Sequence, residues 1–456
     1  LAYVTGRGEL LPRLEDPVSM INGAVRPPSI YLFAEEILQR QYLAHLVDEF
    51  ARDGDDWHHP RTARAALAGA TPGSFLGDLI DKAEGDAESH LGAFLAAFGA
   101  GLRPASVAAL RAWATPSEGP HTSGLAKQVF AASQHWTSAK ELLEHRQLAI
   151  QQALPALLQA AGVAAASEDD KRSLQTAQAA LKLVQARLGD LTGEYWIAAM
   201  EEFGLLPNYT LLGDSATLDV SISWYDPEQG TYESQPTDVQ RPTSQALREF
   251  APGATFYAKG LQIEVDAIDL GTDADGIRVF AFCPDCCYAV DTEETGKPQL
   301  MPACPRCGST GLQDTGQRVP VVELKRASAA IRRDESLIDD RHDDRNRTPF
   351  TIVAAADLDP AFITHPWYVA GYDFGAAYLT RVTIRWLNLG KRATTASPFA
   401  ISGSIVPASR FRVCQSCGHL DNAAGSNSMD EHRPWCPNRK STDEHVRTIV
   451  LSRTLT

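Results

Sequence analysis

Seven of the eight cysteines in this chain fall into two groups with the spacing of metal ligands. The first group contains two Cys-x-x-Cys pairs, and the second combines one such pair with a histidine four residues before a cysteine. Structural Zn²⁺ binds four thiolates or imidazoles in a tetrahedron, and a Cys-x-x-Cys turn supplies two of them. The spacing predicts two zinc sites, with the ligands Cys283, Cys286, Cys304 and Cys307 in the first and Cys414, Cys417, His432 and Cys436 in the second.

Two further residues compete for places in these ligand sets. Cys287 directly follows Cys286, where such turns usually have glycine, so it is either a spare thiolate or a small packed side chain. His419 is an alternative to His432, but it lies too close to Cys417 to close the loop, and His432 is preferred. Disulfides are the other interpretation of the cysteines. Because no signal peptide pattern is present, we expect a cytoplasmic protein whose thiols stay reduced.

The number of ligands predicts that both zinc sites are structural rather than catalytic. A catalytic zinc usually has three protein ligands and an open position for water, whereas each set here has four. The run Asp339–Arg347 has the carboxylates and imidazole of a metal-dependent nuclease, but its alternating charges are more typical of a solvated loop. The sequence contains no phosphate-binding G-x-x-x-x-G-K-[ST] loop and no other recognisable catalytic motif, so whether the chain is an enzyme stays uncertain.

The composition is that of an ordinary soluble protein. Hydrophobic residues make up 44% of the 456 residues and charged residues 22%, and no apolar run is long enough to cross a bilayer, so no membrane partner is expected. The net charge of −15 argues against a chain that coats nucleic acid with its whole surface. A local basic groove remains compatible with it.

The pattern of the chain predicts an α+β multidomain protein. Residues 1–28 form a loop-rich lead-in from a preceding domain, and residues 29–203 form a helical domain with a long helical hairpin. Residues 204–406 form a β-rich domain that contains the zinc ribbon at 283–307, and residues 407–456 form the second zinc-binding segment. The first residue is not Met and the chain stops just after a strand pattern, so we expect a piece of a longer protein with a truncated last segment.

Local signals place several elements within these domains. A helical pattern between Trp136 and Leu158 is expected to be interrupted at Pro155, and Ser167 is expected to begin the second helix of the hairpin. Residues 218–224 alternate with period two, which predicts a strand before a hairpin turn at residues 226–230.

Several stretches together resemble large bacterial superfamily 2 DEAD/DEAH-box helicases with a zinc-binding C-terminal extension, which include mitomycin-repair-type and DISARM-type phage-defence helicases. The resemblance is carried by Arg26–Leu32 with Gln39–Gln41, by Gly204–Tyr209, by Ala246–Gly253 and by the Cys414–Cys436 cluster. It implies the region that follows the motor domains. The motor itself, with its ATP and Mg²⁺ sites, is absent from these residues.

The resemblance implies a zinc-stabilised accessory region that holds or steers single-stranded DNA for an ATP-dependent motor, in the same protein or in a partner subunit, during DNA repair or phage defence. Strand binding needs basic residues beside aromatic surfaces. The candidate DNA contacts are Lys325, Arg326, Arg385, Arg410, Arg412 and Arg433. The alternative is a zinc-stabilised adaptor, or a motorless partner subunit of a helicase complex, that binds protein.

Overall fold

The computed structural model describes residues 34–52, 59–98, 101–208, 215–229, 231–293, 301–338, 349–372, 374–393, 398–421, 432–439 and 445–455. An N-terminal helical region is followed by a β-rich region that contains both cysteine clusters, which confirms the expected α+β class. The predicted lead-in and the run Asp339–Arg347 lie outside the described residues. No described helix combines the length and the hydropathy that a bilayer span needs.

The chain divides into two compact units. The first comprises Leu1–His59, Gly69–Ala132 and Gly204–Pro207, and the second comprises Pro60–Ala68, Ser133–Phe203 and Asn208–Thr456. In the first unit, apolar side chains from successive helices meet around the buried rings of Tyr42 and Phe94. Its helices are α3 (Glu35–Arg52), α5 (Phe75–Gly85), α6 (Ala87–Ala96), α7 (Pro104–Ala114) and the beginning of α8 (Gly124–Ala161).

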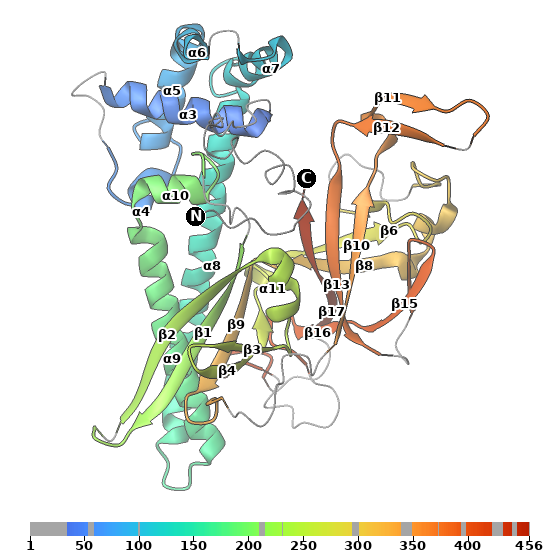
Figure 1. Cartoon of the computed structure of the whole chain (residues 1–456). Coiled ribbons are helices and arrows are strands. Elements are labelled where there is room, and N and C mark those ends of the chain that lie inside the picture. The colour runs from blue at the N-terminus through green and yellow to red at the C-terminus, as the bar shows by residue number, and fades with distance from the viewer. Residues whose placement is uncertain are drawn as a thin grey trace, which may run out of the picture. The chain divides into compact units, whose positions relative to one another are not determined.

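The second unit contains the predicted helical hairpin, formed by α8 from Ser133 onward and by α9 (Glu168–Gly193). The Ser167 side chain accepts a hydrogen bond from the backbone N–H of Asp170, whose carboxylate accepts one from the Ser167 N–H, so α9 begins with a capping box. The indole N–H of Trp136 donates to the carbonyl of Leu191, so the first turns of α8 within this unit lie beside the end of α9 (Figure 1). The helices are therefore antiparallel. Two short helices, α4 (Ala63–Leu67) and α10 (Trp196–Glu202), also belong to this unit.

The expectation of a break at Pro155 is wrong, because α8 continues through it to Ala161. Proline removes one backbone hydrogen bond from a helix interior. The neighbouring Leu154 and Leu157 pack against α9 in an apolar cluster with Ile150 and Val184. We attribute the continuity of the helix to this packing, since tertiary contacts provide most helical stability in proteins.

A four-stranded sheet lies against the hairpin, with the strand order β2-β1-β9-β5. The strands are β1 (Ser215–Asp226), β2 (Thr231–Pro242), β9 (Arg326–Arg332) and β5 (Ala267–Ile268). β1 pairs antiparallel with β2, as the hairpin pattern predicts, and parallel with β9 about a hundred residues later in the chain. Helix α9 packs along β1 and β2 (Figure 1).

The second sheet has nine strands among the described residues, with β14-β15-β13-β17-β8-β6-β7 as its main path. β10 pairs with β13 and β16 pairs with β17. The strands are β6 (Ile277–Phe282), β7 (Ala289–Asp291), β8 (Arg318–Glu323), β10 (Phe350–Asp357), β13 (Thr383–Arg392), β14 (Pro398–Ile401), β15 (Ser404–Ser409), β16 (Phe411–Cys414) and β17 (Val446–Leu455).

Two separate hairpins and a short helix complete the second unit. β3 (Thr255–Ala258) and β4 (Leu261–Glu264) form one hairpin, and β11 (Ile363–Tyr368) and β12 (Gly375–Leu379) form the other. The helix α11 (Thr243–Glu249) packs on a core shared by β1, β9 and β17. Single 3₁₀ turns occur at Thr272–Ala274, Thr310–Gln313, Thr315–Gln317 and Pro360–Phe362.

Candidate metal centres and an arginine-lined cavity

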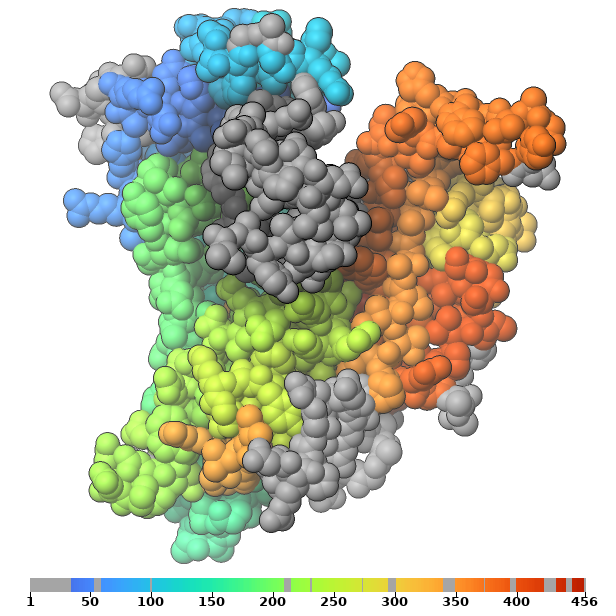
Figure 2. All heavy atoms as spheres, in the orientation of Figure 1, coloured from blue at the N-terminus to red at the C-terminus, as the bar shows by residue number. Residues whose placement is uncertain are grey.

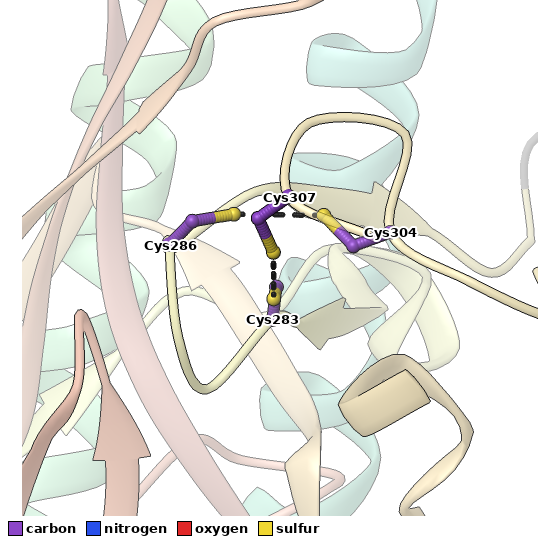
Figure 3. Close-up of side chains that lie close together, drawn as sticks. All are labelled: Cys283, Cys286, Cys304 and Cys307. Atoms are coloured by element: carbon purple, nitrogen blue, oxygen red, sulfur yellow. Dashed lines mark hydrogen bonds between the residues drawn. The ribbon is translucent and has the colours of Figure 1, made fainter. Parts of the chain in front are cut away.

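The four cysteines of the first predicted site converge between β6 and the start of β8. Their sulfur atoms point toward one another from two turns of the chain (Figure 3). The Sγ atoms of Cys283 and Cys307 are 3.6 Å apart, and those of Cys286 and Cys304 are 3.5 Å apart. A tetrahedral Zn²⁺ with Zn–S bonds of about 2.3 Å requires sulfur atoms about 3.8 Å apart, whereas a disulfide requires about 2.05 Å. The spacing therefore fits a tetrahedral thiolate site and excludes disulfides.

The two turns of this centre have matching backbone geometry. The N–H of Cys287 donates to the carbonyl of Cys283, and the N–H of Gly308 donates to the carbonyl of Cys304. Cys287 and Gly308 therefore occupy equivalent positions, with φ of 63° and 75°. This left-handed conformation normally selects glycine, which explains why a residue other than glycine after Cys286 is unusual.

Cys287 lies outside the ligand set. Its side chain is buried in an apolar cluster with Phe282, Val319 and Leu387, and it does not belong to the group of four sulfur atoms that could hold an ion. Glycine would relieve the strain of the positive φ at this position. The apolar packing of the cysteine side chain explains why a residue other than glycine is found there.

The second centre gathers Cys414 at the end of β16 with three ligands from loops. Its side chains lie on two short segments, 414–417 and 432–436. The Sγ atoms of Cys414 and Cys436 are 3.7 Å apart, and Nδ1 of His432 lies 3.6 Å from Sγ of Cys436 and 3.9 Å from Sγ of Cys417. These separations also match a four-ligand tetrahedral site.

His419 does not belong to the ligand set of this centre. Its backbone bridges Ala267, and its Nδ1 lies 3.1 Å from the carbonyl oxygen of Leu420. Burial lowers the pKa of its imidazole. The group that could hold an ion contains His432 and does not contain His419.

Binding a cation at the first centre requires its thiols to lose their protons. Burial raises the pKa of the Cys286 and Cys304 thiols, whereas a hydrogen bond from the Ser309 N–H lowers the pKa of Cys307. Several thiols in one place cannot all become thiolates unless a positive charge compensates them. Both groups can thus hold a metal ion, and their donor atoms suit Zn²⁺.

The structure separates the six candidate DNA contacts. Lys325 is exposed, Arg410 stacks over the Phe399 ring at 5.4 Å, and burial lowers the pKa of Arg410. Arg385 pairs with Asp357 and stacks over Phe280, and Arg412 pairs with Asp421. Only two of the six, Arg326 and Arg433, line a common cavity.

This cavity has a volume of about 760 Å³ and lies between the helical hairpin, the β1–β9 face and the second metal centre. Four arginines line it, Arg146 from α8, Arg187 from α9, Arg326 from β9 and Arg433 from the segment 432–436. Among the described residues, the lining contains two aspartates, Asp219 and Asp269, and neither lysine nor glutamate. Four guanidinium groups therefore meet at one cavity of a chain with net charge −15, and each of them has a carboxylate partner.

Carboxylates fix the guanidinium groups around the cavity. The buried Asp219 accepts a hydrogen bond from Arg187 at 2.7 Å and another from Arg326 at 3.0 Å. Arg187 also lies 3.5 Å from Asp238 and 3.9 Å from Asp190. Nη2 of Arg146 lies 3.4 Å from Asp269. The buried Nε of Arg187 has no hydrogen-bond partner among the described residues. A buried donor of this kind calls for a water or a ligand acceptor.

The sequence analysis did not identify Arg146 and Arg187 as candidate binding residues, although their positions on the helices could have indicated them. Arg146 continues the apolar stripe of Ile150, Ala153 and Leu157 along α8. Arg187 likewise extends the stripe of Ala177, Ala180 and Val184 along α9. An arginine on the apolar face of a helix indicates a buried polar site, because such a side chain needs a partner there.

Comparisons with known proteins identify no relative of this chain. No family model, no curated protein and no solved structure matches it.

Proposed function

We propose that the chain is a zinc-stabilised module that holds single-stranded DNA for an ATP-dependent helicase motor in the same protein or a partner subunit. The observation that carries the proposal is the convergence of four arginines on one cavity of an acidic protein. Two of these arginines, Arg326 and Arg433, are also candidates on sequence grounds. Phosphates of a nucleic-acid strand are the ligands that such guanidinium groups bind best.

Aromatic and apolar groups around the cavity suit the bases of a strand. Trp435 lines it beside Arg433, whose guanidinium carbon lies 5.9 Å from the ring centroid. The helices add Leu143 and Ala149 to the lining. A cavity of about 760 Å³ accommodates one or two nucleotides, since ligand sites of about 300–1,000 Å³ hold molecules of this size. Binding without sequence preference combines such positive and apolar surfaces.

The resemblance to zinc-containing helicase extensions supports the association with a motor. Two of its motifs contribute buried residues: Leu205 and Leu206 are buried in the first unit, and Phe250 and Ala251 belong to a core cluster of the second unit. Gly253 follows with φ of 80°, and its N–H donates to the carbonyl of Val265. These residues stabilise the fold. The resemblance is what suggests DNA repair or phage defence as the pathway of the helicase.

The test is fluorescence anisotropy of a labelled oligothymidine of about 20 nucleotides with the full 456-residue chain. We expect affinity to fall as salt rises, and the variant Arg146→Gln/Arg326→Gln to weaken binding at least about tenfold and to reduce the salt dependence. Arg278→Gln is the matched control, because Arg278 is a half-exposed arginine paired with Asp291 and lies outside the cavity. Equal affinity of both variants and the wild type, or no binding at all, contradicts the proposal.

A second candidate function is a protein adaptor, which the β11–β12 hairpin favours. Figure 2 shows this hairpin, in orange, protruding at the surface. Trp367 pairs with Ala376 and Tyr378 lies two residues further along β12, so these two exposed rings share one face. The exposed ring of Phe374 packs against Trp367, with 5.8 Å between the ring centroids. Exposed clusters of aromatic residues mark protein interfaces. Failure of DNA binding in the anisotropy experiment would favour this function.

A further inference from the structure

The lining of the cavity includes both segments of the second metal centre. Gln415, Ser416 and Gly418 contribute from the first segment, and Arg433 to Pro437 contribute from the second. None of the four cysteines of the first centre lies in the lining. We infer that metal bound at the second centre holds this wall of the cavity and the helical hairpin in place, and so controls DNA binding. The part that concerns DNA rests on the function proposed above.

One set of contacts joins the second metal centre to the helical hairpin. Trp435, between the ligands His432 and Cys436, packs against the apolar cluster of α8 and α9. Three residues after Cys436, Nη2 of Arg439 donates a hydrogen bond of 2.7 Å to Oγ of Ser173 on α9. The segment that supplies two metal ligands therefore contacts both helices.

Another set joins the centre to the four-stranded sheet. The N–H of Ile268 on β5 donates to the carbonyl of Gly418 at 3.0 Å, and Gly418 has no room for a Cβ against the Ile268 carbonyl. Arg433 donates to Asp266, which precedes β5, and to Oγ of Ser328 on β9 at 3.0 Å. The metal centre thus lies between the hairpin and the sheet, with the cavity beside it.

Apart from these side-chain contacts, the segment 432–439 has little regular structure to fix its backbone. It contains no α-helix or β-strand, and its own backbone hydrogen bonds are Cys436 N–H to Arg433 and Arg439 N–H to Cys436. Among the described residues, Asn438 Nδ2 donates to Ser416 Oγ, which links it to the other ligand segment. A metal ion would bind two ligands in each segment and so link the two segments. The binding free energy of a structural zinc site contributes to the free energy of folding.

Loss of the metal has a defined consequence in this arrangement. Without it, Trp435 loses its fixed position relative to the segment 414–417, whereas Arg433 keeps its ion pair with Asp266. Helix α9 then loses two of its attachments, the Trp435 ring and the Arg439–Ser173 hydrogen bond. Amide hydrogens of α9 should exchange faster, because local opening costs less free energy when fewer contacts hold an element.

The experiment compares Cys414→Ser with Cys286→Ser in the full chain, by hydrogen–deuterium exchange and by anisotropy with the same oligothymidine. We expect Cys414→Ser to accelerate exchange in residues 168–193 at least about tenfold and to weaken oligonucleotide binding by a similar factor. Cys286→Ser should accelerate exchange only around residues 277–313 and leave binding unchanged. Unchanged exchange in α9 for Cys414→Ser, or an equal effect of both variants, overturns the inference.

A second variant separates this inference from general unfolding and from the DNA proposal. Trp435→Ala keeps all eight ligands, so it should retain two zinc ions per chain while it accelerates exchange in α9 and weakens binding. Normal exchange in α9 for this variant contradicts the role of Trp435 as a positioning residue. If the wild type does not bind the oligonucleotide, the proposed function fails, and the exchange measurements still decide whether the metal centre holds the hairpin.

Discussion

Arg433 and Asp266 form a two-point ion pair across 167 residues of sequence. Nη1 of Arg433 lies 3.0 Å from Oδ2 of Asp266, and Nη2 lies 2.5 Å from Oδ1. The arginine is buried, with 8% of its side chain exposed. The same carboxylate accepts a hydrogen bond from the N–H of Ala330 on β9, so it joins the metal-binding segment to the sheet.

Replacement of Asp266 by Asn should destabilise the second unit by about 2 kcal/mol, because the buried Arg433 would lose its counter-charge. Equilibrium unfolding in urea measures the change in free energy. Glu293→Gln is the control, since Glu293 pairs with Arg278 at an exposed site and should change stability by less than about 0.5 kcal/mol. Equal effects of the two substitutions would show that the Arg433–Asp266 pair contributes no more than an exposed one.

Metal analysis of the purified chain should find two zinc ions per molecule. Cys286→Ser should reduce the content to one, because it removes a ligand from the first centre. Cys287→Ser should retain two, since Cys287 packs in the apolar cluster and contacts no ion. A loss of zinc in Cys287→Ser would mean that this neighbouring thiol is the true ligand.

Gly418 and Gly308 provide a matched pair for the effect of a side chain beside each metal centre. Both follow a ligand cysteine and have positive φ, of 67° and 75°. A Cβ at Gly308 would meet no atom within 4 Å, whereas one at Gly418 would collide with the Ile268 carbonyl. We expect Gly308→Ala to cost about 1 kcal/mol of unfolding free energy and Gly418→Ala more than about 3 kcal/mol. Similar midpoints in thermal unfolding would contradict the close approach of Gly418 to β5.

The stability of the second unit should also depend on Glu194. Burial raises the pKa of this carboxyl, and the neighbouring Glu202 raises it further. The folded state therefore binds its proton more tightly than the unfolded state, so stability falls as pH rises from the unfolded pKa through the folded one.

Glu194→Gln should therefore stabilise the protein at pH 7, by less than about 1 kcal/mol because the site is partly exposed to solvent. Urea unfolding at a series of pH values checks this, and the difference from the wild type should disappear in acid, where Glu194 is protonated in both states. A constant difference at every pH would assign the effect to packing.

Features encoded within a few residues could be predicted from the sequence. The Cys-x-x-Cys spacing places the sulfur atoms together because each turn is local, and Ser167 begins α9 through its own side chain. The strand and turn around residues 218–230 follow from alternation and from turn-forming residues. These signals need no knowledge of distant partners.

The cavity could not be predicted in the same way, because it depends on pairing between distant segments. β1 pairs parallel with β9, and this pairing places Arg326 beside Asp219 and Arg187. Arg412 and Arg326 are both candidate DNA contacts by sequence. Arg412, however, pairs with Asp421 and lies outside the cavity. A basic residue in a sequence predicts charge, and only the fold determines which carboxylate neutralises it.

The strand β17 has neighbours on both edges, β13 on one side and β8 on the other, and it also pairs with β16. Its residues, Val446–Leu455, are the last to leave the ribosome among those that build the sheet. Until β17 is made, β13 and β8 therefore each have an unpaired edge. Unpaired strand edges promote aggregation. The two parts of the sheet can join through β17 only after translation has passed this strand.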